Sequence, residues 1–148
     1  MQLAIKNKIK TNDRKLYDFL REQCHLSKNI YNQGIFLYRM MLDAYSKLTP
    51  EEKVSLTKED KKKYYLSPSE IYKIVNHENP ENLKLLPAYT ANSIWYMQGK
   101  EMKSYFALLS KKKGTTGGDK INPPSFKPTG DKGFHTLFYD LDQQTTKI

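Results

Sequence analysis

Cysteine, histidine and tryptophan are scarce in this 148-residue chain, and their scarcity excludes several kinds of site. Cys24 is the only cysteine, so the chain can form neither an internal disulfide nor a cysteine-cluster zinc site. His25 follows it directly, which puts the two side chains on different faces of a helix. His77 and His135 lie far away in the sequence. We therefore expect no bound metal ion.

Long apolar runs are also missing. No stretch approaches the roughly 20 apolar residues that a membrane-spanning helix needs. The N-terminus is a short alternating run with lysines in it, which differs from a signal peptide. We therefore expect a soluble, cytoplasmic protein with no membrane partner.

The sequence has no arrangement of residues typical of catalysis. Its acidic residues cluster in "PEEK", "KEDK" and "ENPEN", at helix starts or turns, where capping and solvation explain them. No carboxylate stands alone on an apolar stripe, as a metal-dependent nuclease would require. The glycines do not form a G-x-x-x-x-G-K-[ST] phosphate-binding loop. We expect a protein that is not an enzyme and has no cofactor.

Positive charge is what the chain has in excess. The net charge is +9, and it is concentrated toward the two ends. Residues 1–47 carry nine basic and four acidic residues, residues 48–86 carry seven of each, and residues 87–148 carry nine and five. A basic surface of this kind favours a polyanionic partner, most often nucleic acid. A basic soluble protein with no such partner is the alternative.

An alternating pattern at residues 2–10, "QLAIKNKIK", predicts a half-buried strand with Lys6, Lys8 and Lys10 on one face. These lysines have two explanations, which the sequence leaves open. They protect a sheet edge against aggregation, or they contact phosphates.

Two long stretches with apolar residues at helical spacing predict helices over residues 12–47 and 87–113. Thr11 or Asn12 is the expected cap of the first. Gly34 lies on its apolar stripe, where the missing side chain would let another helix approach closely. A tolerated glycine, costing about 1 kcal/mol, is the alternative.

The remaining segments are shorter. Capping boxes at residues 48–53 and 66–71 predict two short helices in the neutral middle of the chain. Residues 77–87 are expected to be a connector. Residues 114–133, rich in glycine, proline and lysine, predict a long loop. The aromatic run "FHTLFYDL" at 134–141 predicts a strand. The fold class is therefore mainly α, with about four helices between an N-terminal and a C-terminal strand.

The basic residues on these segments form the first set of predicted nucleic-acid contacts. Lysines supply affinity through phosphate contacts but carry no sequence information. Exposed asparagine and glutamine amides can bond base edges, and tyrosines can stack on unpaired bases. The predicted phosphate contacts are Lys6, Lys8, Lys10, Lys111, Lys112, Lys113 and Lys127.

Four motifs occur in an order that resembles the OrfB/TnpB family of transposon-encoded RNA-guided nucleases. A strand leads into a helix with a Tyr-Asn pair, here Tyr31 and Asn32 in "LREQCHLSKNIYNQGIF". A later helix carries an aromatic pair before basic residues, here "MKSYFALLSKKKG". A Gly/Pro-rich loop with a Pro-x-Phe/Tyr-Lys element, here "PPSFKP", and a returning strand follow. Together the motifs span nearly the whole chain.

The resemblance implies a layout and a set of partners. Residues 1–11 would be the first strand of a wedge-like β-barrel, incomplete in this chain. Residues 12–113 would be a helical recognition lobe inserted into it, and residues 114–148 a basic loop and the returning wedge strand. Such modules grip a guide RNA and read a short DNA motif beside the target.

The resemblance also implies specific contacts. Tyr65 (or its neighbour Tyr64), Ser69, Asn92 and Tyr139 fall near positions that read the DNA motif in relatives. The polar face of the first long helix would lie in a nucleic-acid groove, or else be merely solvated. It carries Lys28, Asn32 and Arg39 among its polar residues.

These expectations combine into one hypothesis. The chain would be the DNA- and guide-RNA-binding recognition module of a transposase-associated protein similar to TnpB, located at the nucleoid. The family's nuclease portion lies beyond the part that matches, so the chain would be a front portion or truncated product, with a full-length relative or a downstream nuclease segment as a further partner. The alternatives are a helical protein-interaction module that pairs with such a relative, and an inactive product.

Overall fold

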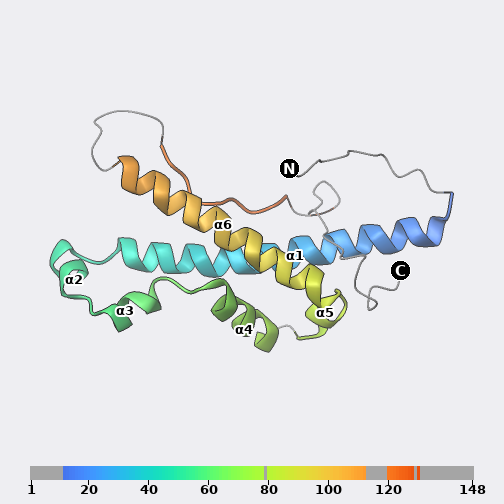
Figure 1. The fold of residues 1–148 in the computed structure, drawn as a ribbon, viewed down its shortest axis with the longest axis horizontal. Helices are drawn as coiled ribbons and strands as arrows, with labels where there is room; N and C mark the ends of the chain where they lie inside the picture. Colours follow the sequence, from blue (N-terminus) through green and yellow to red (C-terminus); the bar gives the residue numbers. More distant parts are fainter. Residues whose placement is uncertain (1–11, 79, 113–119, 129, 131–148) are drawn as a thin grey trace, which may run out of the picture.

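Two long helices that cross each other form the frame of the fold (Figure 1). The computed structural model describes residues 12–78, 80–112, 120–128 and 130. Within these residues the chain is mainly helical, as predicted. The helices, in chain order, are α1 (Arg14–Ser46), α2 (Pro50–Ser55), α3 (Lys58–Lys63), α4 (Pro68–Glu78), α5 (Pro80–Lys84) and α6 (Ala88–Lys112).

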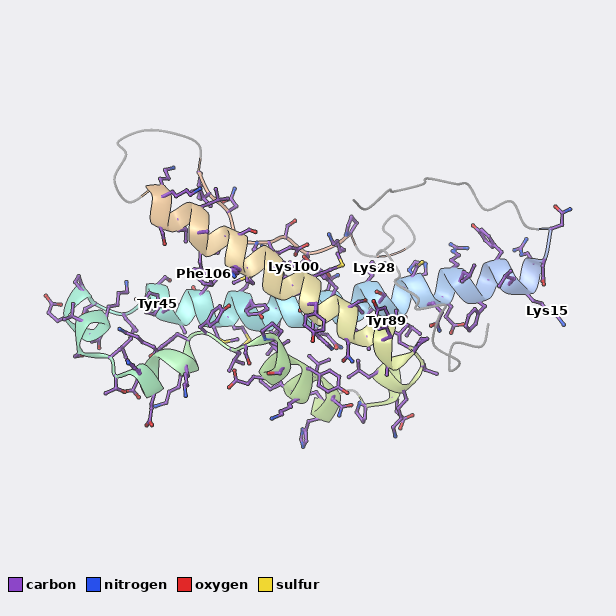
Figure 2. All side chains as sticks on the ribbon, in the orientation of Figure 1. Lys15, Lys28, Tyr45, Tyr89, Lys100 and Phe106 are labelled. Atoms are coloured by element: carbon purple, nitrogen blue, oxygen red, sulfur yellow. The ribbon has the colours of Figure 1, made fainter. Side chains whose placement is uncertain are left out.

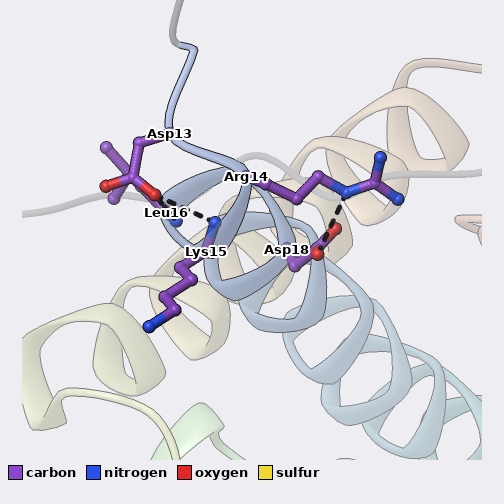
Figure 3. Close-up of polar contacts among 5 residues, drawn as sticks. All are labelled: Asp13, Arg14, Lys15, Leu16 and Asp18. Atoms are coloured by element: carbon purple, nitrogen blue, oxygen red, sulfur yellow. Dashed lines mark hydrogen bonds and ion pairs between the residues drawn. The ribbon is translucent and has the colours of Figure 1, made fainter.

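The two long predicted helices are confirmed to within two residues at each end. The predicted cap of α1 is wrong, because Asp13 holds that position instead of Thr11 or Asn12. Its carboxylate accepts hydrogen bonds from the backbone N–H groups of Lys15 (2.9 Å) and Leu16 (3.2 Å), as Figure 3 shows. A carboxylate also complements the positive end of the helix dipole, which favours aspartate here.

The middle of the chain holds more helices than the sequence predicted. The capping box at Thr49 and Glu52 begins α2 as expected, with Thr49 N–H donating to the Glu52 carboxylate at 2.7 Å. The helix α3 was missed, although Thr57 caps it by accepting from the backbone N–H of Asp60. The predicted connector 77–87 also contains α5. The estimate of about four helices is therefore corrected to six in the described part of the chain.

The core lies where α1, α4 and α6 meet, with α5 closing one end. Apolar and aromatic side chains that are almost wholly buried make up this core. They are Ile30, Tyr31, Ile35, Tyr38, Ile71, Val75, Leu83, Leu86, Ala91, Ile94, Trp95 and Met102. Beyond the crossing, the first turns of α1 extend past the other helices (Figure 1), and Phe19 there is 41% exposed.

Gly34 of α1 lies where a side chain of α6 packs against α1. A Cβ at this position would overlap the side-chain amide of Gln98, which is itself 1% exposed. Gln98 Nε2 donates a hydrogen bond to the backbone carbonyl of Tyr31, one turn before Gly34. The structure therefore agrees with the close-approach explanation of Gly34, since the side chain of Gln98 occupies the space that a Cβ would take.

Both expected strands, at residues 2–10 and 134–141, lie outside the described residues. Residues 120–128 form no helix or strand, as expected for the loop, and run back along α1 and α6 (Figure 1). None of the helices in the described ranges combines the length and the apolar character needed to cross a lipid bilayer.

The crossing predicts a specific stability effect. We expect Gly34→Ala to lower the free energy of unfolding by about 1–3 kcal/mol, because the added methyl group overpacks a filled interface. In a Gln98→Ala background the same change should be neutral or stabilising, since alanine is the better helix former by about 1 kcal/mol. Urea unfolding of the unaltered protein, the two single variants and the double variant, followed by circular dichroism, measures this coupling. Additive effects would contradict the proposed packing.

Candidate nucleic-acid interface

Two surface hollows adjoin each other between the start of α4 and the outer face of α6, since Pro68 and Tyr96 line both of them. We call the pair the α4–α6 groove. Its lining residues are Tyr65, Pro68, Ser69, Tyr72, Asn92, Trp95, Tyr96, Gly99, Lys100 and Lys103. Three predicted motif-reading residues, Tyr65, Ser69 and Asn92, are thus brought together from two segments of the chain.

The α6 side of the groove is a line of polar and aromatic residues on one helix face. Asn92, Tyr96, Lys100 and Lys103 follow the i, i+4, i+8, i+11 spacing that places side chains above one another. All four are exposed, and Tyr96 is exposed by 72%. Sequence reasoning identified only Asn92. The spacing from Asn92 was the signal that could have found the other three.

The α4 side is held close by a glycine and a helix cap. A Cβ at Gly99 would lie 2.7 Å from Cγ of Pro68, so the start of α4 packs directly on α6. Ser67 caps α4, and its backbone N–H donates to the Glu70 carboxylate at 2.7 Å. This hydrogen bond and one from the Ser67 hydroxyl hold the pKa of Glu70 below its usual value. The cap fixes the first turn of α4, and Ser69 with it.

The groove has the chemistry of a nucleic-acid surface. No acidic side chain lines either hollow, and Lys100 and Lys103 give it positive charge. An asparagine amide can form two hydrogen bonds with an adenine edge, and lysines neutralise phosphates. At its floor, Trp95 is 4% exposed and meets the ring of Tyr72 edge-on, with centroids 6.0 Å apart. The polar groups therefore lie beside a buried aromatic pair.

Part of the polar face of α1 is occupied by the segment 120–128, whereas Asn29 on this face is exposed. The Asn32 side chain pairs with the backbone of Lys127 in both directions. Its Nδ2 donates to the Lys127 carbonyl at 3.0 Å, and its Oδ1 accepts from the Lys127 N–H at 2.8 Å. Lys127 precedes Pro128, which has no N–H, so the Lys127 N–H is the last backbone donor of this segment.

Arg39 holds the middle of the same segment, and Lys28 holds Gly130, which lies beyond it. Arg39 donates from Nε and Nη2 to the Pro124 carbonyl at 3.2 and 3.0 Å, and its guanidinium lies 4.9 Å from the centroid of the Phe126 ring. Lys28, only 3% exposed and near the middle of α1 (Figure 2), donates to the Gly130 carbonyl at 2.6 Å. Lys28, Asn32 and Arg39 thus each have a partner within the chain, and Asn32 also lines a surface hollow.

The side chain of Lys127 also contacts α1, at the ring of Tyr31. Its ammonium lies 4.8 Å from the centroid of the Tyr31 ring, a cation–π geometry. The Tyr31 hydroxyl donates to the Glu101 carboxylate on α6. Burial, followed by this hydrogen bond, raises the pKa of Tyr31, which keeps its hydroxyl protonated. The Tyr31-Asn32 pair and the "PPSFKP" element, two of the motifs behind the family resemblance, are thus in direct contact.

The other predicted contacts are scattered or lie outside the described residues. Lys111 is exposed and Lys112 half-buried at the end of α6. Of the predicted residues, Lys6, Lys8, Lys10, Lys113 and Tyr139 lie outside the described ranges. Residues 12–78, 80–112, 120–128 and 130 hold no group of three or more metal-ligating side chains that could bind an ion.

Comparisons with protein-family models, curated proteins and solved structures find no match for the chain.

Asn32 generates a prediction about segment 120–128. We expect Asn32→Ala to speed hydrogen exchange of the Lys127 amide by about tenfold or more, because the mutation removes two hydrogen bonds of about 1 kcal/mol each. Exchange followed by nuclear magnetic resonance measures this. Asn29→Ala, an exposed asparagine one turn earlier in α1, is the matched control and should leave the exchange rate unchanged. Equal exchange rates in the two variants would contradict the pairing.

Proposed function

We propose that this chain is a nucleic-acid-binding recognition module, and that the α4–α6 groove reads a short duplex motif. One observation carries the proposal. Ser69 of α4 and Asn92 of α6 line one hollow, Lys100 and Lys103 of α6 line the hollow that adjoins it, and neither hollow is lined by a carboxylate. Amide and hydroxyl groups suit base edges, whereas the lysines suit the phosphates on either side.

The family resemblance adds the biological setting of the proposal. The module would belong to a transposase-associated protein similar to TnpB, with DNA and a guide RNA as partners. The contact between the Tyr31-Asn32 pair and "PPSFKP" supports this, since two motifs that are 95 residues apart at Asn32 and Lys127 act as one unit. Conservation of both motifs together would then be a requirement of the fold.

The finer part of the proposed fold concerns the two ends of the chain. Residues 2–10 and 134–141 would pair in one sheet, because two separate strands with small apolar faces are marginal in water. The exposed first turns of α1, with Tyr17 52% and Phe19 41% exposed, offer this sheet an apolar surface.

A protein partner is the second candidate function, and one observation favours it. Phe36 and Met40 of α1 are 55% and 54% exposed and line a shallow hollow with Asn29 and Gln33. An apolar face of this kind suits another protein surface. Binding that is insensitive to salt would favour this candidate over the nucleic-acid proposal.

The α4–α6 groove predicts how duplex binding divides between its residues. Asn92→Ala should reduce the difference in binding free energy between preferred and random duplexes by about 1–3 kcal/mol, because it removes an amide that can form two hydrogen bonds with a base. The double variant Lys100→Ala, Lys103→Ala should weaken binding to all duplex sequences alike. It should also reduce the slope of log affinity against log salt concentration by about 1 for each lysine that neutralises a phosphate. Fluorescence anisotropy with labelled duplexes over a range of salt concentrations measures both effects.

Two matched controls accompany these variants. Asn76→Ala changes an exposed asparagine in the last turns of α4, and Lys15→Ala an exposed lysine at the far end of α1 (Figure 2). Neither lines the groove, so both should bind as the unaltered chain does. Equal losses of affinity in the controls and the groove variants would contradict the assignment of duplex binding to the α4–α6 groove.

The proposal also includes the absence of cleavage by this chain. A two-metal nuclease needs several carboxylates converging on ions about 4 Å apart. We expect labelled single- and double-stranded substrates to remain intact with Mg²⁺ or Mn²⁺, with or without guide RNA. Metal-dependent cleavage that co-purifies with the chain and disappears on mutation of one of its own acids, such as Asp140, would overturn this.

A further inference from the structure

A further hollow, which shares only Tyr65 with the α4–α6 groove, lies near the C-terminal ends of α1 and α6. It has a volume of about 670 Å³, within the range of sites for small ligands. The last turns of α1, the helices α2 and α3 and the last turns of α6 form its walls (Figure 1). We call it the aromatic hollow because five aromatic side chains line it, namely Tyr45, Tyr64, Tyr65, Tyr105 and Phe106.

The aromatic rings form two groups, and the neighbouring residues Tyr64 and Tyr65 belong to one group each. Tyr45 and Tyr64 meet edge-on with centroids 5.7 Å apart. Tyr65 and Phe106 meet edge-on at 5.3 Å, and Tyr105 lies 5.2 Å from Phe106. Tyr45 and Phe106 lie at the same end of the molecule in Figure 2. Tyr45 and Tyr65 remain 37% and 41% exposed, so the groups leave ring surface open to solvent.

The charged residues that line the hollow are both lysines. Lys53 lies with its ammonium 5.3 Å from the centroid of the Tyr45 ring, and Lys61 also lines the hollow. No acidic side chain lines it. The nearby carboxylates of Asp43 and Asp60 are paired with other lysines, at 2.6 and 2.9 Å. The hollow therefore combines open aromatic surface with two cations available to an anion.

We propose that the aromatic hollow binds an unpaired nucleotide of a single nucleic-acid strand. The base would stack on the tyrosines, and its phosphate would pair with Lys53 or Lys61. An apolar helix of a partner protein would leave both lysines without a counter-charge, so charge complementarity favours the nucleotide. Tyr65 lines both the hollow and the α4–α6 groove, so a strand leaving a duplex in the groove could place its first unpaired nucleotide here.

The inference rests on the proposed function, in that it requires a chain that binds nucleic acid, but it concerns different residues. The test compares binding of labelled single-stranded RNA and DNA of identical adenine-rich sequence with binding of a duplex. Tyr64→Ala should weaken single-strand binding at least about fivefold, because the mutation removes stacking on one side chain. Tyr64→Phe keeps the ring and should bind as the unaltered chain does. Duplex binding should stay within about twofold in both variants.

Two further measurements keep the test independent of folding. Lys53→Ala changes a side chain outside the core and should also weaken single-strand binding while leaving duplex binding unchanged. An oligonucleotide with one 2-aminopurine should lose fluorescence on binding, and less so with Tyr64→Ala. Tyr89→Ala and Lys15→Ala, remote from the hollow (Figure 2), are the matched controls.

The outcomes separate this inference from the proposed function. Weaker binding of RNA, of DNA or of both supports the inference and identifies the strand. Duplex binding that persists while Tyr64→Ala and Lys53→Ala leave single-strand affinity unchanged overturns the inference alone. Displacement of the strand from the hollow by free AMP at equal concentration would point to a mononucleotide and overturn it as well. Failure to bind any nucleic acid would overturn both proposals.

Discussion

The close crossing of α1 and α6 at Gly34 is the constraint on which the rest of the structure depends. Because Gly34 has no side chain, the amide of Gln98 can pack against the backbone of α1 and donate a hydrogen bond to the carbonyl of Tyr31. Its Oε1 is buried and has no hydrogen-bond partner among the described residues, which is an energetic cost of the tight crossing. The position of the crossing sets the rotation of both helices about their own axes.

That rotation decides which side chains are free to form sites. With Ala91, Ile94, Trp95 and Gln98 turned toward α1 and α4, the opposite edge of α6 must present Asn92 and Tyr96 outward. The same geometry sets Tyr31 between Gln98, Glu101 and Lys127. The interior contact, the α4–α6 groove and the position of segment 120–128 are therefore consequences of one packing arrangement.

Much of this fold could be predicted from the sequence, and the part that could not has physical causes. The long helices are visible because their apolar stripes repeat over many turns, and α2 and α4 because their capping boxes are explicit. The helix α3 was missed because Asp60 takes the place of the usual glutamate in its cap, and α5 because five residues are too few to show a period. Gly34 was interpretable because its position on the stripe has a steric meaning whatever lies opposite.

The partners of polar side chains could not be predicted, because they depend on where a loop returns. The polar face of α1 carries amides and bases where a solvated helix would carry glutamate and lysine, and nucleic acid was one explanation. Asn32 shows a second one. An amide has both a donor and an acceptor, so it can pair with the N–H and the carbonyl of one residue in an extended segment, as it does with Lys127. A carboxylate or an ammonium lacks one of these groups and cannot make the pair. A helix face rich in amides is therefore as well suited to hold a backbone of its own chain as to contact a base, and sequence alone does not distinguish the two.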